Sequence, residues 1–245
     1  MFGASAERKY TMSTLTPTRK VSRRHELRED KMITFSARLL GYIEENRAMA
    51  YAIFGGIILV VGLSLYYSYD QSSKNTVATA EMAVAVTHYE AGEYAAALDG
   101  DISFKGLIEI ATDYGNTDAG NLARFYAADA LFKQGSLDRA LAMFQDFRKD
   151  ANYLGASALA GEASIHESKG DFDTAANLYL RSANLFASSN VAPAYLLNAG
   201  KVFEKASDMN AAARAYEQLK EEYPDTPEAR DIDFFIGRVT AASQN

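Results

Sequence analysis

The chain has 245 residues, 48% of them hydrophobic, which is enough for one large globular domain or two small ones. It contains no cysteine, so disulfides, thiolate nucleophiles and sulfur-ligated metals are excluded. Charge is unevenly distributed: residues 1–47 hold ten Lys and Arg against six Asp and Glu, whereas residues 70–245 hold 15 against 26. The acidic C-terminal part argues against nucleic acid as its main partner, because phosphate binding needs a basic face.

The N-terminal segment has no clear helical or strand pattern, and we predict a disordered, basic cytoplasmic tail over residues 1–30. Its RKVSRR stretch, residues 19–24, could contact anionic lipid or RNA. A basic tail beside a membrane helix is more typical of a topology signal, which we favour. The sequence does not decide whether Met1 or Met12 is the start.

Residues 31–47 are expected to form a juxtamembrane amphipathic helix at the cytoplasmic surface. The prediction rests on apolar residues at helical spacing. They are Met32, Phe35, Leu39, Tyr42 and Ile43.

An uncharged run of twenty residues, AMAYAIFGGIILVVGLSLYY, begins at Ala48 and matches the roughly 30 Å hydrocarbon thickness of a bilayer. We therefore predict a transmembrane helix over residues 48–69. A buried core helix is the alternative, but three glycines in so short a run are more typical of a helix in lipid. A cleaved signal peptide is disfavoured, because 47 residues precede the run and LYYSYD, not small residues, ends it.

Flanking charges predict the orientation of this span. Lys31, Arg38 and Arg47 lie within about twenty residues upstream, and only Lys74 lies as close downstream. The positive-inside tendency keeps the N-terminus in the cytoplasm and exports the acidic C-terminal part.

Small residues recur every four positions in the span, at Ala48, Ala52 and Gly56. They share one helix face, which makes them a candidate contact with another transmembrane helix. Small residues are also common in such helices generally, and the two interpretations stay open.

The stretch FKQGSLDRAL, residues 132–141, has three relatives in the chain: HYEAGEYAAAL at 88–98, HESKGDFDTAA at 166–176 and FEKASDMNAAA at 203–213. Aligned on Gly92, Gly135, Gly170 and Ser207, the copies are 43, 35 and 37 residues apart. This spacing is close to the roughly 34-residue period of a helix-turn-helix solenoid, with an insertion of about nine residues after the first turn.

Each copy alternates small and large positions around its turn residue, as stacked antiparallel helix pairs require. The small positions are Ala85, Ala128, Ala163 and Gly200 before the turn and Ala97, Ala140, Ala175 and Ala212 after it. The large positions hold His88, Leu131, His166 and Phe203, then Tyr94, Leu137, Phe172 and Met209. Phe144, Tyr179 and Tyr216 are expected to fill the space toward the next unit, where the first copy has Asp101.

Two departures from the repeat are predicted. In the first copy the second helix ends near residues 98–100, and another helix restarts around Ile102 to Thr112. After the last copy Pro224 ends a helix, and Thr226 and Pro227 open a final one as N-cap and first residue. This final helix is expected to cap the solenoid.

With these residues the chain resembles the tetratricopeptide repeat family over about residues 76–245. The resemblance is most complete from Gly200 through Ala212 and Tyr216 to Pro224. It implies an all-α fold: a single transmembrane helix, then a TPR-like α-solenoid of about four helix-turn-helix repeats with a C-terminal capping helix. The repeat is specific for a fold and unspecific for a task.

More narrowly, the organisation resembles the YfgM-like ancillary subunits of the bacterial SecYEG translocon. ALDGDISFKGLIEIATDYGNTDAGNLARFYAADALFKQG, residues 97–135, resembles the versions of Bacteroidetes and Chlorobi-type bacteria. The resemblance implies an inner-membrane protein with a periplasmic C-terminal domain. It also implies SecYEG, periplasmic chaperones or secreted clients as partners.

No catalytic motif accompanies the repeats: H-E-x-x-H, the P-loop, G-x-S-x-G and G-x-G-x-x-G are all absent from the sequence. We predict no enzyme activity, cofactor or metal. His88 and His166 occupy the repeat position that Leu131 and Phe203 fill elsewhere, so packing explains them better than metal binding.

The first helices of the second and fourth units are expected to line an inner protein-binding groove, if the family's geometry holds. The candidate residues are Leu122, Phe125, Tyr126, Asp129, Phe132, Leu197, Asn198, Lys201 and Lys205. Coverage of this strip by the inserted segment or the capping helix is an open alternative. Family members that clamp a C-terminal carboxylate use Lys and Asn where the second unit has Phe125 and Asp129. We therefore expect no carboxylate clamp.

The leading hypothesis is a single-pass membrane protein whose exported solenoid binds other proteins at the translocon. The alternative is a structural or assembly subunit of another envelope complex. An enzyme ranks last.

Overall fold

The structure is a computed structural model that describes residues 47–243. The predicted tail (1–30) and all but Arg47 of the predicted juxtamembrane helix (31–47) lie outside this range. The chain divides into two units, residues 1–65 and 66–245. Every regular element in the described residues is a helix, as predicted.

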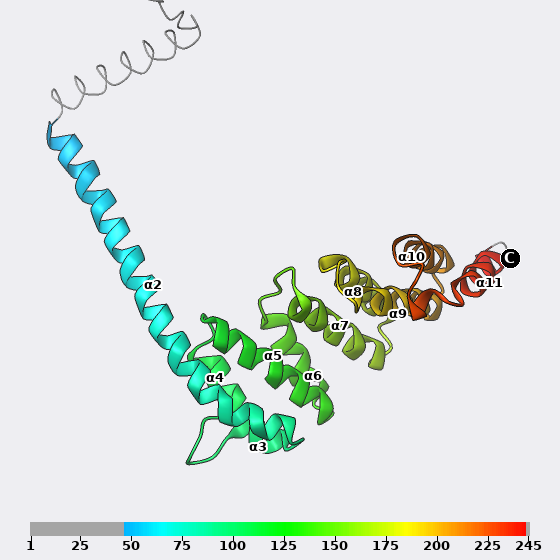
Figure 1. Cartoon of the computed structure of the whole chain (residues 1–245), viewed down its shortest axis with the longest axis horizontal. Coiled ribbons are helices and arrows are strands. Elements are labelled where there is room, and N and C mark those ends of the chain that lie inside the picture. Colours follow the sequence, from blue (N-terminus) through cyan, green and yellow to red (C-terminus); the bar gives the residue numbers. More distant parts are fainter. Residues whose placement is uncertain (1–46, 244–245) are drawn as a thin grey trace, which may run out of the picture. The chain divides into compact units, whose positions relative to one another are not determined.

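Helix α2 (Arg47–Glu90) is 44 residues long and contains the predicted span (Figure 1). In the first unit its apolar side chains are exposed, from Tyr51 to Leu65. By length and composition it is the one helix in residues 47–243 able to cross a membrane. In the second unit it buries Ala78, Met82 and Ala85, and there it forms the first helix of the repeat array.

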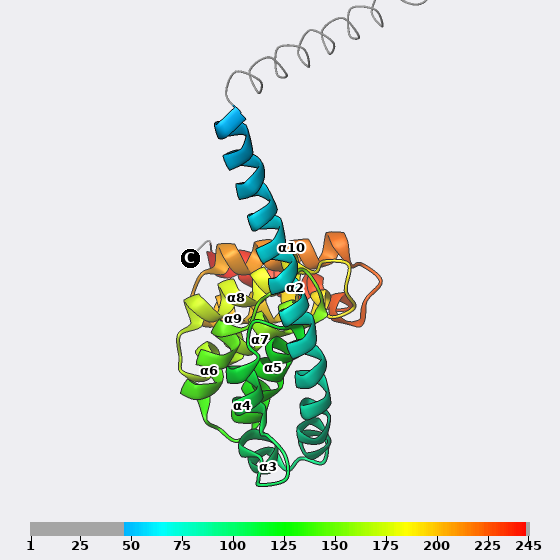
Figure 2. The same ribbon diagram turned by 90° about the vertical axis from the view of Figure 1, so that its left-hand side faces the viewer.

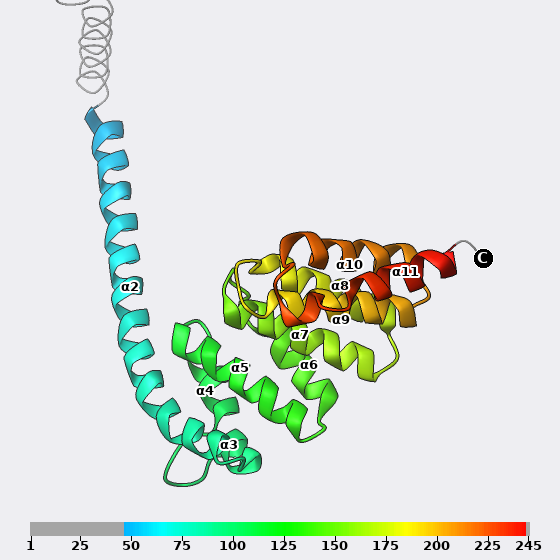
Figure 3. The same cartoon turned by 45° about the vertical axis from the view of Figure 1, so that its right-hand side comes forward.

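The second unit consists of helical hairpins that follow one another along the chain (Figures 1 and 2). The end of α2 shares one buried cluster with α3. Helices α5, α7 and α9 pair with α6, α8 and α10. Helix α4 is inserted after the first pair, and η1 and α11 follow the last (Figure 3). The bounds are α3 (Tyr94–Asp99), α4 (Leu107–Asp113), α5 (Asp118–Lys133), α6 (Leu137–Asp146), α7 (Tyr153–Ser168), α8 (Phe172–Leu185), α9 (Ala192–Lys205), α10 (Met209–Glu222), η1 (Pro227–Ala229) and α11 (Ile232–Ser243).

The four predicted turn residues share one backbone conformation. Gly92, Gly135 and Gly170 have φ of 78°, 77° and 79°, and Ser207 has φ of 63°. Each turn also repeats two backbone hydrogen bonds; in the last, Ser207 N donates to Glu204 O and Asp208 N to Phe203 O. The left-handed conformation reverses the chain between paired helices, which is why glycine recurs there.

Small and large positions pack as the repeat pattern requires. The eight small positions are buried, and at Gly200 a Cβ atom would lie 2.2 Å from Cε1 of Tyr216. The large residues that were expected to reach the next unit are also buried: Phe144, Tyr179 and Tyr216. A Cβ on Gly161 would lie 2.6 Å from Cζ of Phe144, so α6 and α7 cross at close range.

The inserted helix begins later than predicted, at Leu107 instead of Ile102. Residues 100–106 form a closed loop in which Gly100 and Lys105 make an isolated antiparallel bridge. The Asp101 carboxylate accepts hydrogen bonds from the backbone N–H groups of Ser103 and Phe104. A short polar side chain that bonds locally to the backbone competes with helix formation, which explains the delay.

The final helix also begins later than predicted. Pro227 opens the short 3₁₀ helix η1, and α11 starts only at Ile232. Thr226 has no side-chain capping bond; its hydroxyl donates to the Tyr223 carbonyl oxygen instead. Helix α11 buries Ile232 and Val239 and packs on α10, which is the capping position.

Candidate functional site

A pocket of about 590 Å³ lies between α7, α9 and α11. Helix α9 provides most of its wall, because Asn198, Lys201, Val202 and Lys205 are spaced three, four and seven residues apart and share one face. The last turn of α7 adds Glu167, and α11 adds Arg238 opposite Glu204. Three of the predicted groove residues therefore lie together in this pocket: Asn198, Lys201 and Lys205.

Both carboxylates of the pocket are already neutralised. Lys205 Nζ lies 2.7 Å from Glu167 Oε1, and Arg238 Nη2 lies 2.6 Å from Glu204 Oε1. The buried Tyr216 hydroxyl also donates to Glu204, at 2.6 Å. Burial, and then the hydrogen bond to Glu204, raise the pKa of Tyr216 far above its usual range, so the phenol stays a donor.

Lys201 is the unmatched charge of the pocket. Within residues 47–243 its ammonium group makes no ion pair; it lies 5.9 Å from the centroid of the Phe235 ring. The Asn198 side chain, one turn away, makes no hydrogen bond in the same range. An ammonium group beside an amide, both open to a cavity, suits a carboxylate ligand, since both groups can donate to its oxygens.

The aromatic residues predicted on α5 pack mostly against neighbouring helices. The Phe125 ring lies 5.9 Å from that of Phe144 and 5.5 Å from that of Phe147, centroid to centroid. Tyr126 contacts the Tyr89 ring edge-on at 5.0 Å. These rings join α2, α5 and α6, so they stabilise the array, and Phe125 and Tyr126 are half-buried.

The remaining groove candidates are divided. Asp129 accepts a hydrogen bond from the Tyr89 hydroxyl and pairs with Lys133 at 2.8 Å. Phe132 and Leu197 are half-buried against the core. Leu122 lines a different pocket, at the start of α5.

The sequence did not indicate the roles of Glu167, Glu204 and Arg238. They come from three helices and meet only because α11 packs against the last repeat. Charges in the last turns of two helices and in the middle of a third carry no local signal of such a meeting.

The three residues predicted to contact another transmembrane helix are exposed: Ala48, Ala52 and Gly56. A Cβ atom on Gly56 would meet nothing within 4 Å. The contact stays a prediction.

Both described histidines bridge the turn of their own hairpin. His88 Nδ1 lies 2.6 Å from Glu93 Oε2, and His166 Nδ1 lies 2.9 Å from Asp171 Oδ2. In residues 47–243 no three His, Asp or Glu side chains are grouped so as to hold a metal ion.

Models of the tetratricopeptide repeat match residues 125–192 and 194–226. The chain contains tetratricopeptide repeats. The matched residues run from the middle of α5 to just beyond α10, so the pocket-lining residues of α9, among them Asn198 and Lys201, belong to a matched repeat. The end of α2, with α3 and α4, lies outside both matches, which accords with the irregular first hairpin.

Solved structures with TPR-like repeats are also similar. The nearly identical repeats of a kinesin light chain candidate from Podosopora anserina are 11% identical, over 67% of this chain and 86% of that chain, with a TM-score of 0.50. A variant form of the same repeats gives 11% identity, 67% and 85% coverage and a TM-score of 0.49. Comparison with curated proteins gives no significant match. The likeness concerns the fold, which is typical of non-catalytic scaffolds for protein–protein interaction.

Proposed function

We propose that this protein is a membrane-anchored scaffold whose tetratricopeptide repeats bind other proteins on the exported side of the bacterial inner membrane. Its place is beside the Sec translocon, in the handling of secreted chains. One observation carries the proposal: a single unbroken helix, α2, contains both the apolar run and the first helix of the repeat array. An anchor continuous with a binding domain keeps that domain close to the membrane.

The orientation rests on the flanking charges. Arg47 and the basic residues before it outnumber those after the run, which favours a cytoplasmic N-terminus. The repeats are then periplasmic.

Binding is assigned to the pocket between α7, α9 and α11. Lys201 and Asn198 offer donors without partners in the described chain, whereas Glu167 and Glu204 are neutralised by their own partners. The ligand is therefore a protein segment that brings a carboxylate. An ion pair between the ligand carboxylate and Lys201 in a partly desolvated pocket would contribute to affinity and would also fix the orientation of the ligand.

The second candidate function is a fixed subunit of another envelope complex. The exposed small face of Ala48, Ala52 and Gly56 favours it, since a permanent partner helix would cover that face. Gly56→Leu is then expected to reduce co-purification of a membrane partner from mild detergent. Unchanged recovery would count against this contact.

Crosslinking in intact membranes tests the two functions. A photo-crosslinking residue replaces Ala194, one turn before Asn198 on the same face of α9, in the full-length protein. The control replaces Arg214, an exposed residue on α10 of the same repeat. SecY and nascent secreted chains attached through position 194, but not through position 214, support the translocon role. A single stoichiometric partner unrelated to the translocon supports the alternative. A reporter fused to Asn245 that is active only in the cytoplasm contradicts the orientation.

A further inference from the structure

A second pocket, of about 340 Å³, lies at the edge of the array, where α5 and α7 begin and α6 ends. Its apolar lining comes from Leu122, Phe147 and Leu154, one residue from each of three segments. Phe147 is buried, and the two leucines are half-buried. This volume lies at the low end of the roughly 300–1,000 Å³ typical of small-ligand sites and leaves room for one large apolar side chain.

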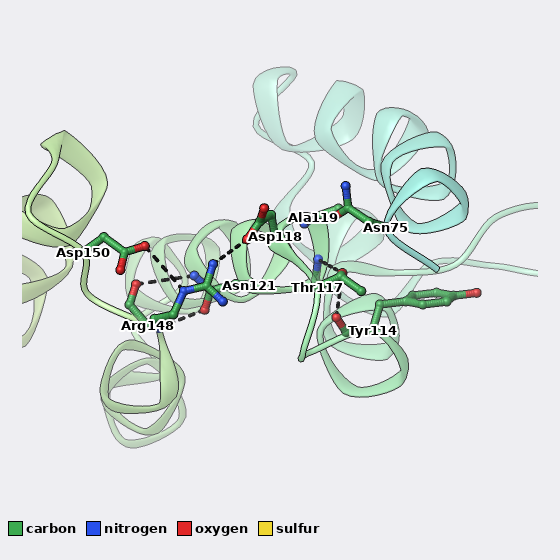
Figure 4. A network of polar contacts seen from close by, with 9 residues as sticks. Asn75, Tyr114, Thr117, Asp118, Ala119, Asn121, Arg148 and Asp150 are labelled. Carbon is green, nitrogen blue, oxygen red and sulfur yellow. Dashed lines mark hydrogen bonds and ion pairs between the residues drawn. The ribbon is translucent and has the colours of Figure 1, made fainter. Parts of the chain in front are cut away.

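The rim of this pocket is held by a polar network around Arg148 (Figure 4). The Asn121 side chain accepts from the Arg148 backbone N–H at 2.8 Å and donates to the Arg148 carbonyl oxygen at 3.4 Å. The Arg148 guanidinium reaches Asp118 at 2.5 Å and Asp150 at 3.4 Å. Asn121 is itself buried, so the loop between α6 and α7 is fastened to α5. A rim fastened in this way needs little ordering when a ligand binds.

The charge of the rim is not balanced. Asp118 and Asp150 share the single guanidinium of Arg148, and their side chains are 84% and 59% exposed. Two carboxylates against one cation leave a net negative edge beside an apolar floor. A ligand that complements both features carries a positive charge next to an apolar side chain.

We propose that this edge pocket is a docking site for a protein segment in which a large apolar residue is followed by a basic one. The apolar side chain enters between Leu122 and Leu154, and the basic group meets Asp118 and Asp150 at the rim. The site is separate from the Lys201 pocket and prefers a ligand of opposite charge. The repeats therefore present two surfaces with different specificities.

Dipeptides test the site on the full-length protein in detergent micelles. The probes are N-acetyl-phenylalanyl-arginine amide and N-acetyl-phenylalanyl-glutamate amide, titrated against protein with isotope-labelled leucine methyl groups. The arginine peptide is expected to shift the Leu122 and Leu154 methyl signals saturably, with a dissociation constant on the order of 1 mM. The dissociation constant of the glutamate peptide should be at least about threefold higher, because its carboxylate meets the net negative rim.

A double substitution, Asp118→Asn with Asp150→Asn, turns the rim positive and is expected to reverse the order of the two peptides. The matched control, Asp173→Asn with Asp225→Asn, removes two exposed carboxylates elsewhere and should preserve the order. As Asp118 lies in the first turn of α5, Asp173 in the first turn of α8 matches its effect on the helix dipole. Asp118→Glu with Asp150→Glu retains the charge and should retain the preference even if packing changes.

Separate results distinguish this site from the proposed function. Lys201→Glu should leave the arginine-peptide response intact, whatever it does to crosslinking from the pocket between α7, α9 and α11. Absence of leucine methyl shifts, equal affinity for the two peptides, or the same reversal in the control would overturn the docking site. None of these outcomes depends on a role at the translocon.

Discussion

Ser207 is the one non-glycine residue at the four repeat turns and the one described non-glycine residue with positive φ. The substitution Ser207→Gly tests whether that turn conformation is under strain. Ser207 is exposed, and its hydroxyl makes no hydrogen bond within residues 47–243, so the change removes only the Cβ and hydroxyl. The two backbone hydrogen bonds of the turn can form with either residue.

The expected effect is a gain in the free energy of unfolding. A left-handed conformation costs a non-glycine residue roughly 1–2 kcal/mol, because its Cβ approaches the backbone. Glycine loses more chain entropy on folding, roughly 0.5–1 kcal/mol relative to alanine. The difference leaves a net stabilisation of about 0.5–1 kcal/mol. For a domain of this size that corresponds to roughly 1–4 °C in the unfolding temperature.

Urea unfolding of the full-length protein in mild detergent, followed by circular dichroism at 222 nm, the usual helix band, measures this change. Ser136→Gly is the matched control, because Ser136 follows the turn glycine of the second hairpin and has φ of −80°. Glycine is not favoured at a negative φ, so Ser136→Gly should lower the free energy of unfolding by a few tenths of a kcal/mol. A Ser207→Gly midpoint equal to or below that of the unsubstituted protein would refute the strain argument. The strain argument would also be refuted if Ser207→Gly and Ser136→Gly shifted the urea midpoint in the same direction by the same amount.

Two further substitutions test the packing of the array. Gly200→Ala should destabilise the protein by about 1–3 kcal/mol, because the new methyl group would overlap the buried Tyr216 ring. Gly237→Ala, where a Cβ would meet nothing within 4 Å, should be neutral or stabilising. Thermal unfolding compares the two variants, and equal behaviour would contradict the close helix crossing. Lys149 pairs with the buried Glu162 at 2.8 Å, so Lys149→Met should cost about 3–5 kcal/mol by leaving that carboxylate unpaired. Adding Glu162→Leu should restore most of the loss, and failure of this rescue in urea unfolding would show that Lys149 acts mainly through its bonds to the end of α6.

The repeat architecture could be predicted because its determinants are local. A turn that needs positive φ selects Gly92, Gly135 and Gly170, and a close helix crossing selects a small residue a fixed number of positions away. These constraints recur in every hairpin, so several copies reveal them together. Two helix starts, predicted at Ile102 and Thr226, were misplaced. Both lie where the chain leaves the repeat, and there a local side-chain hydrogen bond or a proline determines the backbone conformation.

The binding surfaces depend on contacts between residues far apart in the chain. Sequence reasoning placed Asn198, Lys201 and Lys205 on one face of a helix, since helical spacing is enough for that. It did not reveal that Arg238 and Glu167 complete the pocket, because their meeting depends on how α11 and α7 stack on α9. Sequence reasoning also did not show that the Phe125 ring packs against Phe144 of the neighbouring helix.

By itself, then, the sequence determined the helical class, the repeat register and the apolar run of α2, because each follows from the periodicity of neighbouring residues. Only the tertiary structure decided which charges are neutralised and which face a cavity. Whether Lys201 has a carboxylate within reach, or Asp118 shares its guanidinium with Asp150, depends on helices packed side by side. Electrostatic pairing falls off over a few ångströms, and distances of that size are set by stacking.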